Sequence, residues 1–146
     1  MIVTEIVFAG LLVGWAAVRA HQPEIASTEK PMEIMFINAI RASETFPPRD
    51  AWLSGYAISY YYFGYVIIAM LADLSAVGSG TAFNLAIALI TALTAIGALG
   101  VVYNLVRAPL RRNRVEHHVT AGASQGIAAG LLAILFLWFM GNLGTA

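Results

Sequence analysis

The chain has no cysteine and few charged residues, and both shortages restrict what it can be. Of its 146 residues, 11% are charged and 60% are hydrophobic. A soluble domain has about 25% charged residues, so a soluble fold would lack polar side chains to cover its surface. The absence of cysteine excludes disulfides, thiolate metal sites and cysteine nucleophiles. The net charge of +0 gives no sign of an overall basic footprint for nucleic acid. An integral membrane protein is expected.

The N-terminal apolar run lacks the basic start of a secretory signal. No Lys or Arg precedes it, and Glu5 lies within it. A signal peptide has a positively charged start and a small-residue cleavage site. We therefore expect residues 2–20 to form a membrane helix that is retained.

Four apolar stretches have at least the approximate length that a helix needs to cross a bilayer, about 20 residues. They predict spans at about residues 2–20, 56–77, 81–106 and 119–141. Helices are expected because backbone groups in lipid must be satisfied within their own segment. The predicted fold is an all-α polytopic membrane helix bundle, with residues 1–146 forming a single transmembrane domain.

Two polar connections separate these spans, and four spans place both on one side of the membrane. They cover residues 21–55, called loop one here, and residues 107–118. Every Lys and Arg lies in or beside them. Cytoplasmic loops are enriched in these residues, so the charge count alone puts both connections in the cytoplasm. The plasma membrane is the expected location.

Small residues recur at a four-residue spacing in the fourth predicted span. Gly122, Gly126 and Gly130 form two overlapping GxxxG units on one helical face. This spacing lets two helix backbones approach closely, so we expect the face to pack within the chain or against a partner helix. Asn84, in the third predicted span, is expected to form an interhelical or interfacial hydrogen bond.

Loop one is predicted to contain an amphipathic helix at about residues 31–42. Pro31 suits the first turn of a helix, and the pattern is typical of a helix lying in the membrane interface. The alternative is a juxtamembrane helix that only fills space. The expected apolar face consists of Met32, Met35, Phe36, Ala39 and Ile40.

Aromatic residues crowd the start of the second predicted span. Some suit an aromatic belt at the headgroup level. However, the consecutive residues Tyr60, Tyr61 and Tyr62 cover most of a helix circumference. At least one of them is therefore expected to face protein or a cavity.

Five acids make loop one the main candidate for chemistry. Carboxylates beside a membrane can act as general bases or hold a divalent cation, so a divalent cation is one option for a cofactor. A solvated loop would have the same composition, and spacing alone does not choose between these readings. The acids are Glu24, Glu29, Glu33, Glu44 and Asp50.

A series of motifs in this region resembles a family of very large membrane proteins named for its YYY motif, the Chlor-Arch-YYY family. The similarity continues along the whole chain. Members are several times longer, so the resemblance implies an internal fragment whose remainder would be a partner. The motifs are His21-Gln22-Pro23-Glu24, Glu29-Lys30-Pro31-Met32, Phe46-Pro47-Pro48 and Tyr60-Tyr61-Tyr62-Phe63.

The family is in turn similar to GT-C-type glycosyltransferases, which take sugars from polyprenyl-phosphate carriers. This resemblance implies that Glu24 is the first candidate for the acidic residue that acts in catalysis or activates the acceptor, followed by Glu29 and Asp50. It also implies that Lys30, Arg41 or Arg49 pairs with the carrier phosphate, and that Tyr60, Tyr61 and Tyr62 line the carrier or sugar site.

Glycosyl transfer of this kind requires loop one outside the cytoplasm, against the charge count. We follow the resemblance, because flanking helices of a longer protein would dominate the topology. The alternative is a non-enzymatic membrane subunit, in which loop one is an interfacial brace and the Gly122 face is a docking surface. A transporter is disfavoured, because no acid or base lies securely at mid-membrane depth.

Overall fold

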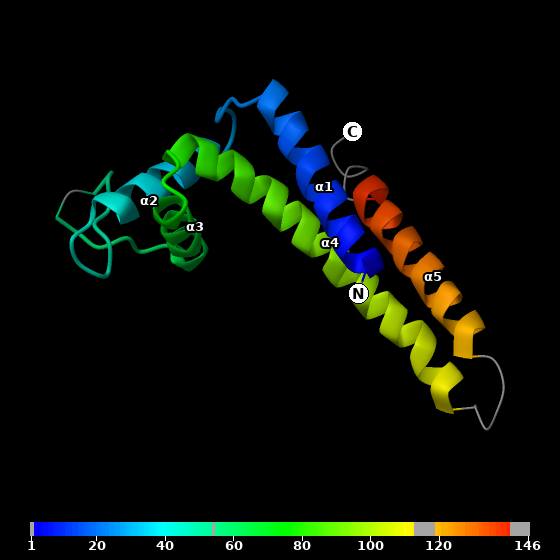
Figure 1. Cartoon of the computed structure of the whole chain (residues 1–146). Helices are drawn as coiled ribbons and strands as arrows, with labels where there is room; N and C mark the ends of the chain where they lie inside the picture. Colours follow the sequence, from blue (N-terminus) through cyan, green and yellow to red (C-terminus); the bar gives the residue numbers. More distant parts are fainter. Residues whose placement is uncertain (1, 54, 113–118, 141–146) are drawn as a thin grey trace. The chain divides into compact units, whose positions relative to one another are not determined.

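Five helices make up the described part of the chain. A computed structural model describes residues 2–53, 55–112 and 119–140. Within these ranges no strand is present, and one isolated bridge joins Arg49 to Ala57. The all-α prediction is confirmed. The helices are α1 (Ile2–His21), α2 (Lys30–Ala42), α3 (Phe63–Leu74), α4 (Ser79–Arg112) and α5 (Val119–Met140) (Figure 1).

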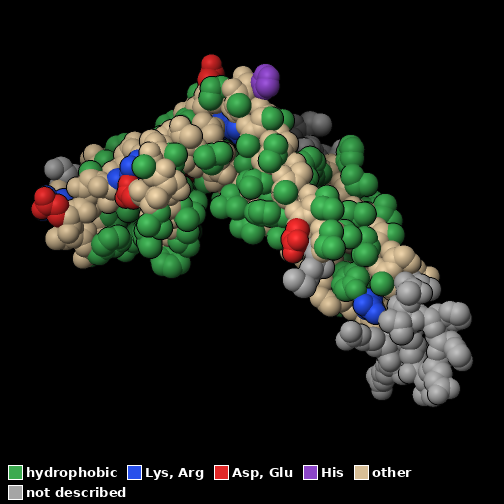
Figure 2. Space-filling view, in the orientation of Figure 1, with side chains coloured by type: hydrophobic (Ala, Val, Ile, Leu, Met, Phe, Trp, Pro, Cys, Tyr) green, Lys and Arg blue, Asp and Glu red, His purple; other side chains and the backbone are tan. Residues whose placement is uncertain are grey.

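Three of the described helices are long and apolar enough to cross a membrane. They are α1, residues Ser79–Ala108 of α4, and residues Gly122–Met140 of α5. α1 has no buried residue, and hydrophobic side chains cover much of the surface visible in Figure 2. Exposed apolar side chains on helices of this length are typical of membrane-spanning segments. The prediction of an integral membrane protein is confirmed.

The second predicted span, residues 56–77, is only partly helical. Its helix, α3, has 12 residues, which is about 18 Å at 1.5 Å per residue. The hydrocarbon core is about 30 Å thick, so α3 is too short to cross it. The prediction that the helix begins at residue 56 was wrong, and the described residues support three spans rather than four.

The late start of α3 has a local cause in the backbone before it. The amide of Ile58 donates to the carbonyl of Pro48 at 2.9 Å, and the amide of Asp50 donates to the carbonyl of Tyr56 at 2.9 Å. Gly55 has φ +90°, a conformation that side chains with a Cβ rarely adopt. Residues 56–58 are therefore paired with loop one and are not available to a helix.

The other boundaries follow the sequence closely, with one exception. α1 and α2 begin and end within one residue of the predicted limits, and α5 begins at the predicted residue. α4 continues to Arg112, so the predicted connection at residues 107–118 begins later than expected. The rest of that connection, residues 113–118, lies outside the described part.

The chain divides into two units, and α1 and α4 each contribute to both. We call Val13–Leu89 the loop unit, and Met1–Leu12 together with Ile90–Ala146 the span unit. In the span unit, Leu99 of α4 and Ile134 of α5 are buried against each other, with Val7 and Leu11 of α1 packed on them. This core joins all three helices that contribute to the span unit.

The core of the loop unit lies between α2, α3 and the start of α4. Ile37 and Ile40 of α2 are buried with Ala69 of α3 and Phe83 of α4, and α2 lies beside α3 (Figure 1). The helix predicted in loop one is therefore present. Its buried face includes Ile37, which was not in the predicted stripe, because the face packs against protein. An interfacial position of α2 stays a prediction.

Candidate functional site

The three candidate acids of loop one have different environments. Glu24 is exposed in the irregular segment that follows α1, and its backbone carbonyl accepts a hydrogen bond from Arg19 Nη2 at 3.1 Å. Glu29 is exposed at the N-cap of α2, and its side chain makes no capping hydrogen bond. These two carboxylates face the surroundings, so they are accessible to a ligand.

Asp50 has a structural contact instead. Its Oδ1 accepts the amides of Trp52 at 2.8 Å and Leu53 at 3.0 Å. This is the Asx-turn arrangement, in which an Asp side chain replaces a backbone acceptor two residues before the amide. The Asp50 carboxylate stabilises the turn that precedes Gly55.

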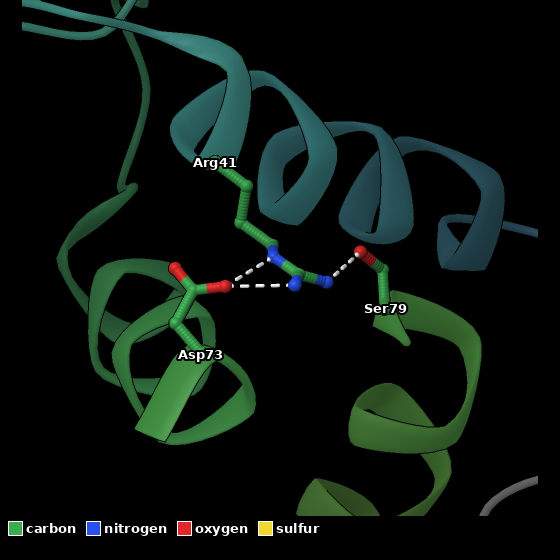
Figure 3. Close-up of polar contacts among 3 residues, drawn as sticks. All are labelled: Arg41, Asp73 and Ser79. Carbon is green, nitrogen blue, oxygen red and sulfur yellow. Dashed lines mark hydrogen bonds and ion pairs between the residues drawn. The ribbon is translucent and has the colours of Figure 1, made fainter. Parts of the chain in front are cut away.

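The predicted phosphate-binding cations also differ from one another. Arg41 donates through Nε to Asp73 Oδ1 at 2.8 Å and through Nη1 to Ser79 Oγ at 2.8 Å (Figure 3). Its Nη2 lies 2.7 Å from the same carboxylate oxygen. Lys30 is the half-buried first residue of α2, and Arg49 is exposed in the bridge with Ala57. Arg41 therefore has its charge balanced within the chain.

The tyrosine triplet lies before α3 rather than on it. The ring of Tyr60 stacks on Phe36 with centroids 5.5 Å apart, and Tyr61 is 83% exposed beside it. Tyr62 is partly buried against the loop-unit core. Tyr60 and Tyr62 thus contact protein, in agreement with the expectation that at least one tyrosine would, although the triplet lies in a loop and not on a helix.

A contact that the sequence did not suggest joins α2 to α3. The hydroxyl of Tyr65 donates to Glu33 Oε1 at 3.3 Å. Burial, together with the neighbouring Glu33 carboxylate, raises the pKa of Tyr65 to about 12. The phenol consequently stays protonated, and remains the donor to Glu33, to a higher pH than an ordinary tyrosine would. Spacing could not reveal this pair, because the two residues are 32 positions apart.

A second unpredicted cluster lies between the end of α1 and the start of α4. Arg19 Nε donates to Asn84 Oδ1 at 2.8 Å, and Asn84 Nδ2 donates to the carbonyl of Pro23 at 3.1 Å. The interhelical role predicted for Asn84 is confirmed. These residues border a pocket of about 220 Å³, whose lining also includes Thr81. In the sequence, Asn84 stands out as a polar residue inside an apolar run, but the sequence does not identify Arg19 as its partner.

The glycine face of α5 lies against α4 in the span unit. Gly122, Gly126 and Gly130 are all buried. A Cβ at Gly126 would be 2.8 Å from Tyr103 Cδ2, and one at Gly130 would be 2.9 Å from Leu99 Cγ and 3.0 Å from its carbonyl oxygen. Only glycine, which has no Cβ, allows α5 to pack this close to α4 at these positions.

No metal site is visible in the described ranges. Within residues 2–53, 55–112 and 119–140, no three His, Asp or Glu side chains are grouped so that they could hold an ion. His117 and His118 lie outside these ranges.

Comparison with known families places the whole chain in one group. The family described as uncharacterized membrane protein DUF2298 matches residues 1–146. The chain belongs to DUF2298. The YYY-motif family is another designation of DUF2298, so the resemblance expected from the tyrosine and proline motifs is confirmed. No curated protein and no solved structure matches this DUF2298 chain.

Proposed function

We propose that this DUF2298 chain forms part of a membrane glycosyltransferase that uses a polyprenyl-phosphate-linked sugar, with Glu24 as the catalytic base. The observation that carries the proposal is the position of Glu24. It lies three residues after the end of a membrane-spanning helix, its backbone carbonyl accepts a hydrogen bond from Arg19, which lines a pocket, and its side chain is exposed. GT-C-type enzymes, which the family resembles, have their essential acid in the corresponding loop.

The reaction is an inverting displacement at the sugar. The Glu24 carboxylate takes the proton from an acceptor hydroxyl while the acceptor oxygen forms a bond to the anomeric carbon. The bond from that carbon to the phosphate oxygen breaks, and the phosphate leaves with the electron pair. A carboxylate within hydrogen-bond reach of the acceptor hydroxyl can take this proton as a general base.

The three spans support the orientation that this reaction requires. If α1, α4 and α5 cross and α3 does not, loop one and the connection after α4 lie on opposite sides. Within about 20 residues of the span ends, the basic residues on the loop-one side are Arg19, Lys30 and Arg41. Four arginines lie between residues 107 and 114 on the other side. The positive-inside rule then favours loop one outside the cytoplasm.

The remaining candidates have supporting roles in the proposal. Glu29 is the second accessible acid, whereas Asp50 holds its turn. Tyr61 and its neighbour Tyr60 expose aromatic surface on which a sugar or a prenyl chain can pack. Lys30 lies at the start of α2 and Arg49 in the bridge with Ala57, and the position of Arg41 beside Asp73 leaves it a bracing role.

Sugar transfer by the full-length protein tests the proposal. Membranes containing the wild type or Glu24→Gln are incubated with a polyprenyl-phosphate sugar labelled in the sugar, and label on the acceptor fraction is counted. We expect Glu24→Gln to reduce transfer at least a hundredfold at equal protein abundance. Glu44→Gln is the matched control, because Glu44 is an exposed acid of the same loop. Equal transfer by Glu24→Gln and the wild type would refute the proposal and favour a non-enzymatic subunit.

A further inference from the structure

A pocket at the membrane end of two spanning helices combines a cation with an apolar wall. It lies in the loop unit and has a volume of about 220 Å³. Arg19 belongs to the last turn of α1, and Thr81 and Asn84 belong to the first two turns of α4. The apolar part of the lining comes from Ala16, Ala20 and Leu85. Such a lining suits a ligand with a charged head and a hydrocarbon body.

The Arg19 guanidinium is held in place by neutral acceptors. Nε and Nη2 donate to Asn84 Oδ1 at 2.8 and 2.5 Å, and Nη2 also donates to the carbonyl of Glu24 at 3.1 Å. Asn84 is itself fixed, since its Nδ2 donates to the carbonyls of Pro23 and Gly80. The side chain is therefore oriented before a ligand arrives, which lowers the entropy lost on binding.

None of these contacts neutralises the charge of Arg19. Within the described ranges, the ion pair between Lys or Arg and a carboxylate is that of Arg41 with Asp73. Arg19 Nη1 takes no part in the hydrogen bonds that hold the side chain. A guanidinium with free N–H groups pairs well with phosphate oxygens, through charge-assisted hydrogen bonds.

We propose that this pocket binds the phosphate of a membrane lipid, with Arg19 as the principal ligand and the hydrocarbon chain along Ala16, Ala20 and Leu85. The inference rests on the proposed function, for which it identifies the site of the carrier phosphate. It replaces Lys30, Arg41 and Arg49, the cations that the sequence suggested. The N-terminal turn of α4 adds a favourable dipole for an anion.

Binding of farnesyl phosphate to the full chain in detergent micelles tests this inference. Isothermal titration is run for the wild type, for Arg19→Gln and for the control Arg49→Gln, an exposed arginine outside the pocket. We expect Arg19→Gln to weaken binding at least tenfold and Arg49→Gln to change it less than twofold. Equal affinity of Arg19→Gln and the wild type would overturn the inference.

Two further measurements keep the result clear. If Arg19→Gln does not fold by circular dichroism, Ala20→Leu fills the pocket from the exposed side and leaves the Asn84 contacts in place. Ala20→Leu should weaken the binding of farnesyl phosphate at least fivefold, and unchanged binding would overturn the inference. Inorganic phosphate and farnesol are titrated separately. Inorganic phosphate that binds as tightly as farnesyl phosphate would overturn the assignment to a lipid, as would farnesol that binds equally well.

These assays separate the inference from the proposed function. Glu24→Gln should retain farnesyl phosphate binding, because the Glu24 backbone, not its side chain, contacts Arg19. Retained binding with no loss of transfer in Glu24→Gln contradicts the enzymatic proposal alone. Loss of transfer in Glu24→Gln with unchanged binding in Arg19→Gln contradicts the phosphate site alone.

Discussion

Arg41 and Asp73 form the ion pair that ties α2 to the end of α3. The same guanidinium donates to Ser79, the first residue of α4, so one side chain connects three helices (Figure 3). The side chain of Arg41 is 27% exposed and that of Asp73 is 59% exposed. At this exposure the pair has a modest effect on stability and a larger effect on geometry.

Replacing Arg41 should therefore weaken the loop unit slightly without affecting a phosphate site. We expect Arg41→Gln to lower the free energy of unfolding by about 1 kcal/mol or less. Thermal melting in detergent measures this change. The affinity for farnesyl phosphate should stay within twofold of the wild type. A tenfold loss of affinity would mean that Arg41 leaves Asp73 to bind the ligand.

Adding a methyl group to the glycine face of α5 should disturb its packing on α4. At Gly130 a Cβ would meet the Leu99 carbonyl oxygen at 3.0 Å, and that atom belongs to the backbone and cannot rotate away. We expect Gly130→Ala to destabilise the chain by about 1–3 kcal/mol. Gly97→Ala is the matched control, because nothing lies within 4 Å of a Cβ there. Equal melting temperatures for the two variants would contradict this packing.

The raised pKa of Tyr65 predicts a loss of stability at high pH. Its pKa is about 12 in the folded chain and 10.0 without the protein surroundings. The contribution of Tyr65 to the free energy of unfolding is present below pH 10 and is lost as the pH rises from 10 toward 12. In that interval the unfolded chain releases the tyrosine proton and the folded chain retains it. The difference in stability between the wild type and Tyr65→Phe should change over this interval.

Absorbance at 295 nm provides an independent check on the same group. One of the six tyrosines should ionise near pH 12 in the wild type, and this late step should be missing in Tyr65→Phe. A wild-type titration that is complete by about pH 11, one unit above the ordinary tyrosine pKa, would show that Tyr65 is not shielded.

The sequence predicted the long helices well, because hydrophobic length depends on local composition. α1, α4 and α5 all lie where apolar runs of spanning length were found. The sequence-based prediction failed at the start of α3. There the apolar composition continues through residues 56–62, but the backbone of residues 56–58 pairs with loop one. The pairing of Ile58 with Pro48 is a contact between segments, and composition does not encode it.

The candidate site was predicted by residue type but not by partner. Loop one was identified as the polar region of interest, and Glu24 and Glu29 are accessible there. The sequence could not show that Asp50 holds a turn or that Arg41 is paired with Asp73. It also could not show that Arg19 and Asn84, 65 positions apart, meet beside a pocket. Such relationships depend on how the helices pack.

The proposed function requires that loop one lies outside the cytoplasm on a chain that crosses the membrane three times. The chain has no native cysteine, so single cysteines can be introduced at Glu44 in loop one and at Arg114 in the connection after α4. Intact cells are treated with a membrane-impermeant maleimide. We predict that Glu44→Cys is labelled in intact cells, and that Arg114→Cys is labelled only after permeabilisation. Labelling of both positions from the same side would contradict the three-span topology and, with it, the placement of Glu24 in an external catalytic loop.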